Sequence, residues 1–347
     1  MSIAVCGANG YQGKLVLAEL VARGIRPVAV GRDRLRLQAA TAGIADTEVR
    51  VAEVDDHEAL AAAFRDVDAV VNCAGPFSET GHRVIRAAVS AGTPYVDTAG
   101  EQAYVKSVFD TFGDAPVSLV PAANDGCVPV DLVAELMSAD VLRTDRITVT
   151  HLIAGGGAPS RGSLRSAVRT MDALVSGGLT YVDGQWRTGV PASIDQVRLE
   201  KEPVAVVQMP LCEVITIPRH VAVGNVESLV EAAVGERLRT PIPPGLVDTL
   251  PEGPSAADRA RQRFTYVVDV WRGGEVVSRG VVEGVDTYGT TAVIAVEAAR
   301  RLGAGGQRPG ALAPSEAFEA ADFLGRLGLR WSIGKSVTGA VLKDPLE

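Results

Sequence analysis

The residues Ile3-Ala4-Val5-Cys6, followed by Gly7-Ala8-Asn9-Gly10-Tyr11-Gln12-Gly13, decide how this chain folds. Four apolar residues and then three evenly spaced glycines predict a strand, a tight turn and the start of a helix. Gly7 permits the turn, Gly10 lets backbone N–H groups approach a pyrophosphate, and Gly13 lets the helix pack closely on the strand. The helix N-terminus adds partial positive charge. The stretch therefore predicts a binding turn for a nucleotide cofactor, although glycines at this spacing also occur in turns that bind nothing.

The rest of the first 131 residues alternates between strand and helix patterns. Further strands are predicted at residues 27–30, 49–54, 69–73, 95–101 and 117–121, with helical patterns between them. The strand at 69–73 is apolar on both faces, as a central strand of a parallel sheet is. This alternation predicts the α/β class, with a Rossmann-type doubly wound parallel sheet.

Beyond residue 131 the pattern changes to longer strands. Residues 147–153 alternate as a half-exposed antiparallel strand does, and residues 264–271 and 275–285 flank a predicted hairpin turn at Arg272-Gly273-Gly274. Residues 240–258 are rich in proline and glycine, which predicts a long loop or lid. We therefore predict a second α+β domain built on an open, largely antiparallel sheet.

These patterns divide the chain into three segments. We predict a dinucleotide-binding domain at residues 1–131, a substrate and dimerisation domain at 132–305, and a C-terminal segment at 306–347 that returns to the first domain. Antiparallel edges in the second domain predict a homodimer, because such edges can pair across a two-fold axis.

The end of the second strand bears on which dinucleotide binds. Gly31-Arg32-Asp33 lies at about the distance where this fold contacts the adenosine ribose. Arg32 places a guanidinium where a 2′-phosphate would lie, which favours NADP, whereas Asp33 leaves NAD open as the less favoured cofactor. A solvated Arg32 at the head of the next helix is the alternative. Asp55 and Asp56 end the third strand, from where a side chain reaches the adenine edge, and Asp56 equally suits a helix N-cap.

The fourth strand ends in Cys73-Ala74-Gly75-Pro76-Phe77, a loop of mostly small residues. The carboxyl ends of parallel strands line the ligand site in such folds. Residues 73–77 are therefore predicted to bind the nicotinamide half of the cofactor.

Taken in order, these motifs resemble the saccharopine dehydrogenase-like oxidoreductases, a family that includes the trans-acting enoyl reductases of lipid biosynthesis. The resemblance rests on residues 7–13 and 31–33, on Asn72-Cys73-Ala74-Gly75-Pro76-Phe77, on Gly92-Thr93-Pro94-Tyr95-Val96-Asp97-Thr98-Ala99-Gly100-Glu101, and on Asn124-Asp125-Gly126-Cys127-Val128-Pro129-Val130-Asp131. It covers the first 131 residues firmly and the remainder loosely. It implies a dinucleotide-binding domain joined to an open-sheet domain that shapes the substrate pocket and often the dimer interface.

Two departures from the family pattern bear on the substrate. Saccharopine-forming members usually have a different loop in place of residues 74–77, which argues against lysine metabolism. Residues 124–131 keep the proline and the final aspartate of the lipid enoyl reductases but change what precedes them. The resemblance therefore does not carry the substrate of either group to this chain.

Reduction by a nicotinamide cofactor requires the protein to place the substrate and to supply a proton. His151, on a strand that faces the predicted site, is the first candidate for the proton donor and Asp125 is the second. The alternatives are a structural histidine and a turn aspartate. Arg161 and Arg219 are candidates for binding a substrate carboxylate or phosphate, with solvated arginines as the alternative.

Composition excludes several other classes of protein. The chain has 347 residues, 47% of them hydrophobic, and a formal net charge of −8 without a basic cluster that would bind nucleic acid. No membrane segment or secretory leader is predicted, so we expect a cytoplasmic protein. Four cysteines without C-x-x-C pairing predict reduced thiols and no metal site. A reactive thiol is the alternative for Cys73 and Cys127, which lie in predicted site loops.

Together these observations predict an NADP-dependent oxidoreductase that transfers hydride to a C=C, C=N or C=O bond of a small or carrier-bound biosynthetic intermediate. The alternative is a sensor or scaffold that binds NADP without turnover, since related folds serve that purpose. A test of turnover distinguishes the two.

Overall fold

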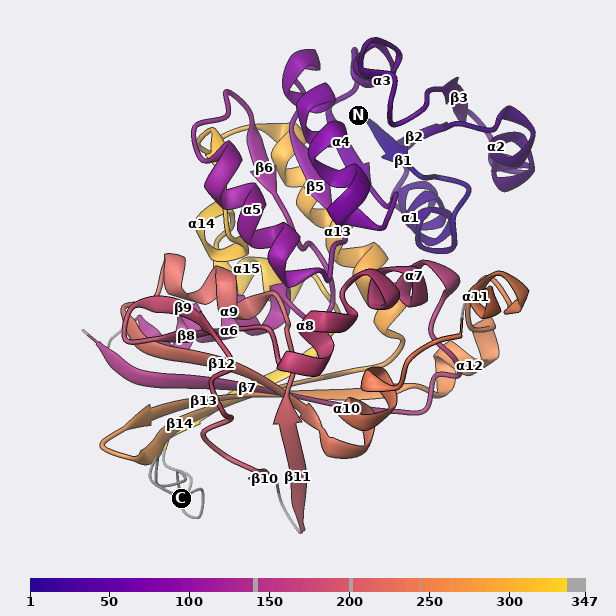
Figure 1. The fold of residues 1–347 in the computed structure, drawn as a ribbon. Coiled ribbons are helices and arrows are strands. Elements are labelled where there is room, and N and C mark those ends of the chain that lie inside the picture. The colour runs from indigo at the N-terminus through magenta and orange to yellow at the C-terminus, as the bar shows by residue number, and fades with distance from the viewer. Residues whose placement is uncertain (140–142, 200–201, 244, 336–347) are drawn as a thin grey trace.

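A computed structural model of the chain describes residues 1–139, 143–199, 202–243 and 245–335 (Figure 1). Its first sheet has seven parallel strands in the order β15-β6-β5-β4-β1-β2-β3. They are β1 (Ser2–Cys6), β2 (Arg26–Gly31), β3 (Glu48–Val51), β4 (Ala69–Asn72), β5 (Tyr95–Asp97), β6 (Ser118–Val120) and β15 (Gly310–Ala311). The strand order reverses between β1 and β4, which confirms the predicted Rossmann-type sheet. We call the side on which these strands end the carboxyl edge.

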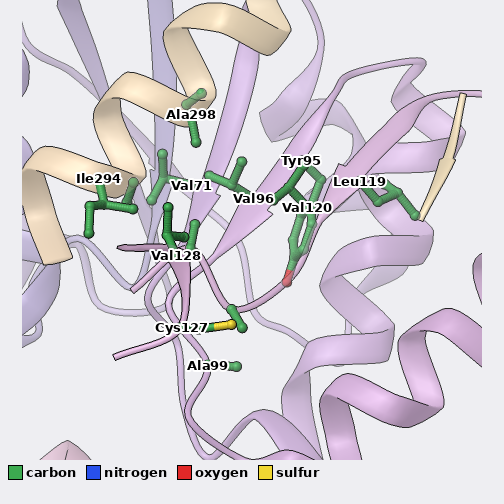
Figure 2. Packing of buried hydrophobic residues seen from close by; sticks show 14 of the residues in the cluster. Val71, Tyr95, Val96, Ala99, Leu119, Val120, Cys127, Val128, Ile294 and Ala298 are labelled. Carbon is green, nitrogen blue, oxygen red and sulfur yellow. The ribbon is translucent and has the colours of Figure 1, made fainter. Parts of the chain in front are cut away.

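Helices cover both faces of this sheet, which is why β1, β2 and β4 are apolar and buried. These helices are α1 (Tyr11–Ala22), α2 (Arg34–Thr41), α3 (His57–Phe64), α4 (Phe77–Ala91), α5 (Gln102–Phe112) and α13 (Thr287–Ala304), whereas α6 (Val128–Ser138) follows β6 and leads to the second sheet. Helix α13 comes from the range predicted as the second domain, yet it packs on α1, β4 and β5. Figure 2 shows its Ile294 and Ala298 directed toward Val71 and Val96 of the sheet.

The second sheet has nine strands and is largely antiparallel, as predicted. They are β7 (Thr144–Ala154), β8 (Leu179–Val182), β9 (Gln185–Thr188), β10 (Gln196–Arg198), β11 (Pro203–Gln208), β12 (Val223–Glu231), β13 (Arg263–Arg272), β14 (Glu275–Gly284) and β16 (Arg330–Lys335). The main order is β10-β11-β12-β7-β13-β14-β16, and among the described strands of this sheet only β12 and β7 pair in parallel. Gly273 and Gly274 have φ of 58° and 82° and close the predicted hairpin between β13 and β14.

Two local predictions are wrong. Strand β7 is not half-exposed: its residues from Ile147 to His151 are all buried, because both faces of the strand are covered. The predicted loop at 240–258 contains α11 (Leu246–Thr249) and the start of α12 (Ala256–Arg261). Helix α12 begins there because Ser255 and Asp258 form a reciprocal capping box.

The remaining helices connect or cover the two sheets. They are α7 (Arg161–Arg169), α8 (Met171–Ser176), α9 (Glu213–Thr216), the 3₁₀ turn η1 (Ile217–Arg219), α10 (Ala232–Arg239), α14 (Pro314–Ala317) and α15 (Ala320–Gly325). Helix α6 packs on β13 and β14 of the second sheet and on α14 and α15. It therefore lies between the two parts of the molecule, by which we mean the first sheet with its helices and the second sheet with its helices.

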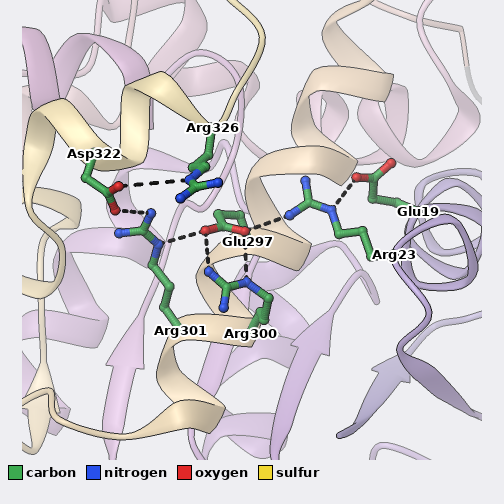
Figure 3. A network of polar contacts seen from close by, with 7 residues as sticks. All are labelled: Glu19, Arg23, Glu297, Arg300, Arg301, Asp322 and Arg326. Carbon is green, nitrogen blue, oxygen red and sulfur yellow. Dashed lines mark hydrogen bonds and ion pairs between the residues drawn. The ribbon is translucent and has the colours of Figure 1, made fainter.

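The segment after residue 305 contacts the first part of the chain at several points. Strand β15 pairs with β6, and Figure 3 shows Asp322 of α15 joined through Arg301 to Glu297 of α13. Glu297 also binds Arg23 of α1 at 2.6 Å. Burial alone would raise the pKa of Glu297, but the guanidiniums of Arg300 and Arg301 lower it to about 2. Residues 336–347 of the predicted C-terminal segment lie outside the described residues, and the boundaries at 131 and 305 stay a prediction.

Candidate functional site

The turn at residues 7–13 forms a cradle that requires glycine. Gly7 has φ of 77°, and a Cβ on it would lie 2.9 Å from the Ala74 backbone nitrogen. A Cβ on Gly13 would lie 2.3 Å from the Gly7 carbonyl oxygen. Gly10 is the N-cap of α1 and brings no side-chain acceptor, so the first N–H groups of the helix stay available to a phosphate. The residues present therefore fit a dinucleotide pyrophosphate.

The side chains of Tyr11 and Gln12 are hydrogen-bonded to residues from the later part of the chain. The Tyr11 hydroxyl donates to the Pro254 carbonyl oxygen at 2.6 Å, and Gln12 Nε2 donates to the Tyr288 carbonyl oxygen at 3.1 Å. Both partners lie more than 240 residues along the chain. At these two positions, the backbone groups are therefore what remains available for the predicted contacts with the cofactor.

Arg32 stands at the end of β2 with an exposed side chain and no polar partner among the described residues. Asp33 is engaged instead: its carboxylate caps α2 by accepting the Arg36 backbone N–H at 3.1 Å. Asn9 reaches this strand end from the cradle, because its Oδ1 lies 3.2 Å from where a Cβ on Gly31 would stand. A free guanidinium beside a committed carboxylate suits a 2′-phosphate better than a bare ribose hydroxyl.

The two aspartates that follow β3 have local partners. Asp56 caps α3 by accepting the Ala59 backbone N–H at 3.0 Å, and Asp55 forms an exposed ion pair with Arg83. The N-cap predicted as one role of Asp56 is therefore present. The adenine contact stays a prediction for both residues.

The predicted nicotinamide loop at residues 73–77 is fixed by hydrogen bonds to two buried side chains, those of Asn72 and Glu101. Asn72 Oδ1 accepts the Ala74 backbone N–H at 2.9 Å. The Glu101 carboxylate accepts the N–H groups of Phe77 at 2.7 Å and Ser78 at 2.8 Å, and so caps the start of α4. Glu101 is 4% exposed. The sequence analysis did not identify Glu101 as a positioning residue, because its two partners lie 23 and 24 residues before it.

Asp97 is a second anchor of the carboxyl edge that the sequence analysis missed. Its Oδ1 accepts the N–H groups of Ala99 and Ala122, and its Oδ2 accepts the hydroxyls of Tyr95 and Tyr104. Burial raises the pKa of Asp97, and these four hydrogen bonds act in the opposite direction. One side chain thus fixes the loops that follow β5 and β6. The available signal was an aspartate directly after the apolar Tyr95-Val96.

The structure joins Asp125 to His151 through Tyr266. Tyr266 donates its hydroxyl to Asp125 Oδ2 at 2.5 Å, and its ring lies 4.4 Å from the His151 ring. Thr291 donates to Asp125 Oδ1 at 2.8 Å. Burial raises the pKa of Asp125, while the hydrogen bonds from Tyr266 and Thr291 lower it. Both predicted catalytic residues therefore belong to one network next to the end of β6.

The two residues differ in access. Asp125 is half-buried in the loop after β6, whereas His151 is 4% exposed. The Nε2 atom of His151 lies 2.8 Å from Glu213 Oε1, which also accepts the Ser228 hydroxyl at 2.6 Å. This arrangement places Asp125 nearer the carboxyl edge and His151 behind it.

The two predicted substrate-binding arginines have different surroundings. Arg161 is the first residue of α7, and its half-buried guanidinium has no polar partner among the described residues. Arg219 instead pairs with Glu316 at 2.8 Å and stacks on the Phe109 ring at 4.1 Å. The structure does not bring Arg219 to the other site residues; its guanidinium ties η1 to α14.

Burial determines the state of the cysteines in the predicted site loops. It raises the pKa of the thiols of Cys73 and Cys127, so both are protonated at neutral pH. This is the opposite of what a reactive thiolate requires. Within the described ranges, no group of three or more His, Cys, Asp or Glu side chains is arranged to hold a metal ion. Nor does any helix in the same residues have the length and apolar character that a bilayer crossing demands.

The strand order, the glycine cradle and the polar anchors at the carboxyl edge define a dinucleotide-binding protein of the Rossmann class. Residues 3–120 match the family model described as the saccharopine dehydrogenase NADP binding domain. This part of the chain is therefore similar to that domain, which confirms the resemblance and the preference for NADP.

Relatives among characterised sequences match over part of their length. A lipid droplet localized protein of Caenorhabditis elegans is 27% identical over 146 residues, which cover 38% of this chain and 34% of that protein. A trans-acting enoyl reductase of Mycobacterium bovis is 26% identical over 140 residues, with coverage of 38% and 34%. A human saccharopine dehydrogenase-like oxidoreductase is 22% identical over 223 residues, with coverage of 57% and 47%. The matches thus span about a third to a half of these relatives.

One solved structure is similar over nearly the whole chain. Saccharopine dehydrogenase (L-Glu forming) of Saccharomyces cerevisiae has a TM-score of 0.65 with 11% sequence identity, and the likeness covers 97% of this chain and 100% of that one. At this identity the likeness shows that the fold, with both sheets, is shared.

Proposed function

We propose that this protein is an NADP-dependent oxidoreductase that reduces a C=C, C=N or C=O bond of a small or carrier-bound intermediate by direct hydride transfer. The observation that carries the proposal is the glycine cradle of residues 7–13, next to an Arg32 without a partner in the described structure, in a domain that matches an NADP-binding family. NADPH supplies the hydride when it is bound, and the protein supplies binding, orientation and a proton.

Each part of the carboxyl edge has a role in holding this cofactor. The N–H groups at the start of α1 bind the pyrophosphate, and the Arg32 guanidinium binds the 2′-phosphate. The loop at residues 73–77, fixed by Asn72 and Glu101, supports the nicotinamide half. Since this loop is held by hydrogen bonds to buried side chains, its part of the site is organised before the cofactor arrives.

Asp125 is the better placed of the two predicted proton donors. Its carboxyl group is half-buried at the carboxyl edge, and burial raises its pKa toward the protonated acid. In the proposed step the substrate takes hydride at carbon and a proton from the Asp125 carboxyl group. The Tyr266 hydroxyl orients that carboxyl, and His151 packs behind the Tyr266 ring as a positioning residue.

Arg161 is the proposed contact for an anionic group on the substrate. Its guanidinium lacks a polar partner among the described side chains, and its own backbone N–H is fixed by the Glu252 carbonyl oxygen at 3.0 Å. A carboxylate or phosphate would satisfy the guanidinium with two parallel hydrogen bonds. This feature favours a substrate that carries such a group, either free or as part of a carrier.

The first test is a titration of the purified protein with NADPH and NADH, followed by nicotinamide fluorescence. We expect NADPH to bind more tightly, and Arg32→Ala to weaken NADPH roughly 10- to 100-fold while leaving NADH unchanged, as the loss of a charge-assisted contact predicts. Arg65→Ala is the matched control, because Arg65 is an exposed arginine at the opposite edge of the sheet.

Two outcomes would decide against the proposal at different levels. If neither dinucleotide binds, the cradle is only structural and the cofactor assignment fails. If NADPH binds but is not oxidised with any member of a panel of aldehydes, imines and enones, offered free and as pantetheine thioesters, the sensor or scaffold alternative replaces the enzyme. In an active enzyme, Asp125→Asn should lower kcat and leave NADPH affinity unchanged. In a protein without turnover, Asp125→Asn should change neither quantity.

A homodimer is the proposed assembly. The described edge strands β10 and β16 of the second sheet end the order of strands and leave backbone groups for a partner. Light scattering on the purified chain, whose mass is 36.1 kDa, should then report twice that mass.

A further inference from the structure

Helix α7 bridges two places on the carboxyl edge. At its first turn, the Ser160 backbone N–H donates to the Tyr288 hydroxyl oxygen at 2.8 Å, and Ser163 Oγ lies 3.0 Å from that same hydroxyl. At its second turn, Ser166 Oγ donates to Glu101 Oε1 at 2.6 Å. The helix is therefore fastened at both turns by hydroxyl groups.

The two anchors lie at the two parts of the predicted cofactor site. Tyr288 adjoins the cradle, since its carbonyl accepts from Gln12 and its ring lies edge-to-face with the Tyr11 ring at 5.1 Å. Glu101 caps the start of α4 directly after the nicotinamide loop. A Cβ on Gly75 in that loop would lie 3.6 Å from Ser166 Oγ. Helix α7 thus runs from the phosphate-binding turn to the nicotinamide loop.

Helix α7 is exposed to solvent although both of its turns are hydrogen-bonded to other elements. None of its nine residues is buried, although helices α1, α4 and α13 each bury several. Ser163 and Ser166 are three residues apart, so they share the face that is turned to the edge. Ser166 is half-buried and Ser163 is exposed, so the Ser163 hydroxyl is accessible to a ligand.

We propose that α7 covers the nicotinamide half of bound NADPH, and that the hydroxyls of Ser163 and Tyr288, at the cradle end of the helix, hydrogen-bond the nicotinamide ribose. A hydroxyl both donates and accepts, so the pair complements the hydroxyl groups of a ribose. The inference rests on the proposed function, because it requires NADPH at the carboxyl edge.

The test compares NADPH with adenosine 2′,5′-bisphosphate, which shares its adenosine end and lacks nicotinamide. Ser163→Ala and Tyr288→Phe should each weaken NADPH roughly 2- to 10-fold and leave the bisphosphate unchanged, as the loss of one hydrogen bond predicts. The bound nicotinamide should also become more accessible to acrylamide quenching. Ser107→Ala and Tyr181→Phe are the matched controls, because both residues lie away from the carboxyl edge on α5 and β8.

The outcomes separate this inference from the proposed function. If neither ligand binds the wild-type protein, the proposed function fails. If both bind and the two variants leave NADPH affinity and quenching unchanged, or weaken both ligands equally, α7 does not contact the nicotinamide half of the cofactor. Should Tyr288→Phe fail to fold, Ser166→Ala tests the far anchor: it should speed NADPH release and leave bisphosphate release unchanged, and equal rates would overturn the inference.

Discussion

The two sheets of this molecule hold their buried polar groups in different places. In the first sheet the central strands are apolar, and the buried polar side chains Asn72 and Asp97 stand at the carboxyl ends of β4 and β5. In the second sheet the buried polar side chains lie along the strands, as Thr148 on β7, Glu227 on β12 and Asp269 on β13 do.

The partners of these groups show what the difference means. Glu227 binds Arg146 at 2.7 Å, Asp269 binds Arg279 at 2.6 Å, and Trp271 Nε1 donates to Thr148 Oγ1 at 3.0 Å, all between strands of the second sheet. The first sheet is stabilised by apolar burial, and its buried polar groups lie at one edge, where they fix the loops of the candidate site. The second sheet relies on polar pairs for its own cohesion.

The largest expected effect comes from breaking one such pair. Arg279→Met leaves the Asp269 carboxylate, which is 2% exposed, without its cation, and should cost about 3–5 kcal/mol in the free energy of unfolding. The matched change in the first sheet is Arg26→Met, whose pair with Glu48 is exposed and should contribute about 0–1 kcal/mol. Urea unfolding of both variants measures the two losses, and equal losses would remove the contrast between the sheets.

The next effect concerns the boundary between the two parts. His220, beside η1, lies between Asp131 at 2.9 Å and Glu135 at 2.7 Å, both on α6. Burial alone would lower the pKa of His220, but the charges of Asp131 and Glu135 raise it from 6.5 to about 9. The shift corresponds to about 3 kcal/mol at 1.36 kcal/mol per pKa unit.

The sign of this contribution follows from linkage. The stability that protonated His220 provides is complete below pH 6.5 and is lost as the pH rises through about 9. Urea unfolding at pH 6, 7.5 and 9 should show that loss in the wild-type protein and not in His220→Gln. A wild-type profile as flat as that of the variant would show that protonated His220 does not stabilise the folded chain.

How far the sequence predicts the molecule depends on the distance over which each feature is encoded. The cradle, Arg32 and residues 73–77 follow their strands directly, so the spacing of glycines and apolar runs locates them. The prediction that one side of β7 is exposed was wrong. An alternation with period two shows that a strand has two different faces, but it does not show whether other elements cover each face. Strand β15 has two residues and therefore no period at all.

The missed parts of the candidate site have partners far away in the chain. Asp125 and Tyr266 are 141 residues apart, and Ser160 and Tyr288 are 128 residues apart. The sequence around a tyrosine on an apolar strand does not indicate which carboxylate the tyrosine hydroxyl will bind. Such pairs are set by the packing of the second sheet against the first, which no local pattern records.

A smaller effect is expected within the first part, where close backbone packing replaces charge. Gly13→Ala places a methyl group 2.3 Å from the Gly7 carbonyl oxygen, and overpacking of this kind costs about 1–3 kcal/mol. If the turn moves to relieve the contact, NADPH affinity falls roughly 10- to 100-fold. Gly325→Ala on α15 is the control, because a Cβ there meets no atom within 4 Å. Unchanged NADPH binding by Gly13→Ala would show that the cradle does not bind the cofactor.

The smallest effect is expected from an ion pair between the two parts. Lys14 on α1 binds Glu252 at 2.6 Å, but the side chains are 43% and 33% exposed, so Lys14→Met should cost about 0.2–1 kcal/mol and less in 1 M NaCl. Tyr11 makes the neighbouring contact with a hydroxyl bound to Pro254 and a ring packed on Gly253, neither of which salt screens. The loss in the free energy of unfolding caused by Tyr11→Phe should therefore be the same at low salt and in 1 M NaCl. If Lys14→Met costs more than Tyr11→Phe at low salt and this excess disappears in 1 M NaCl, the contact between the two parts depends on charge, and the contrast between the sheets does not extend to their boundary.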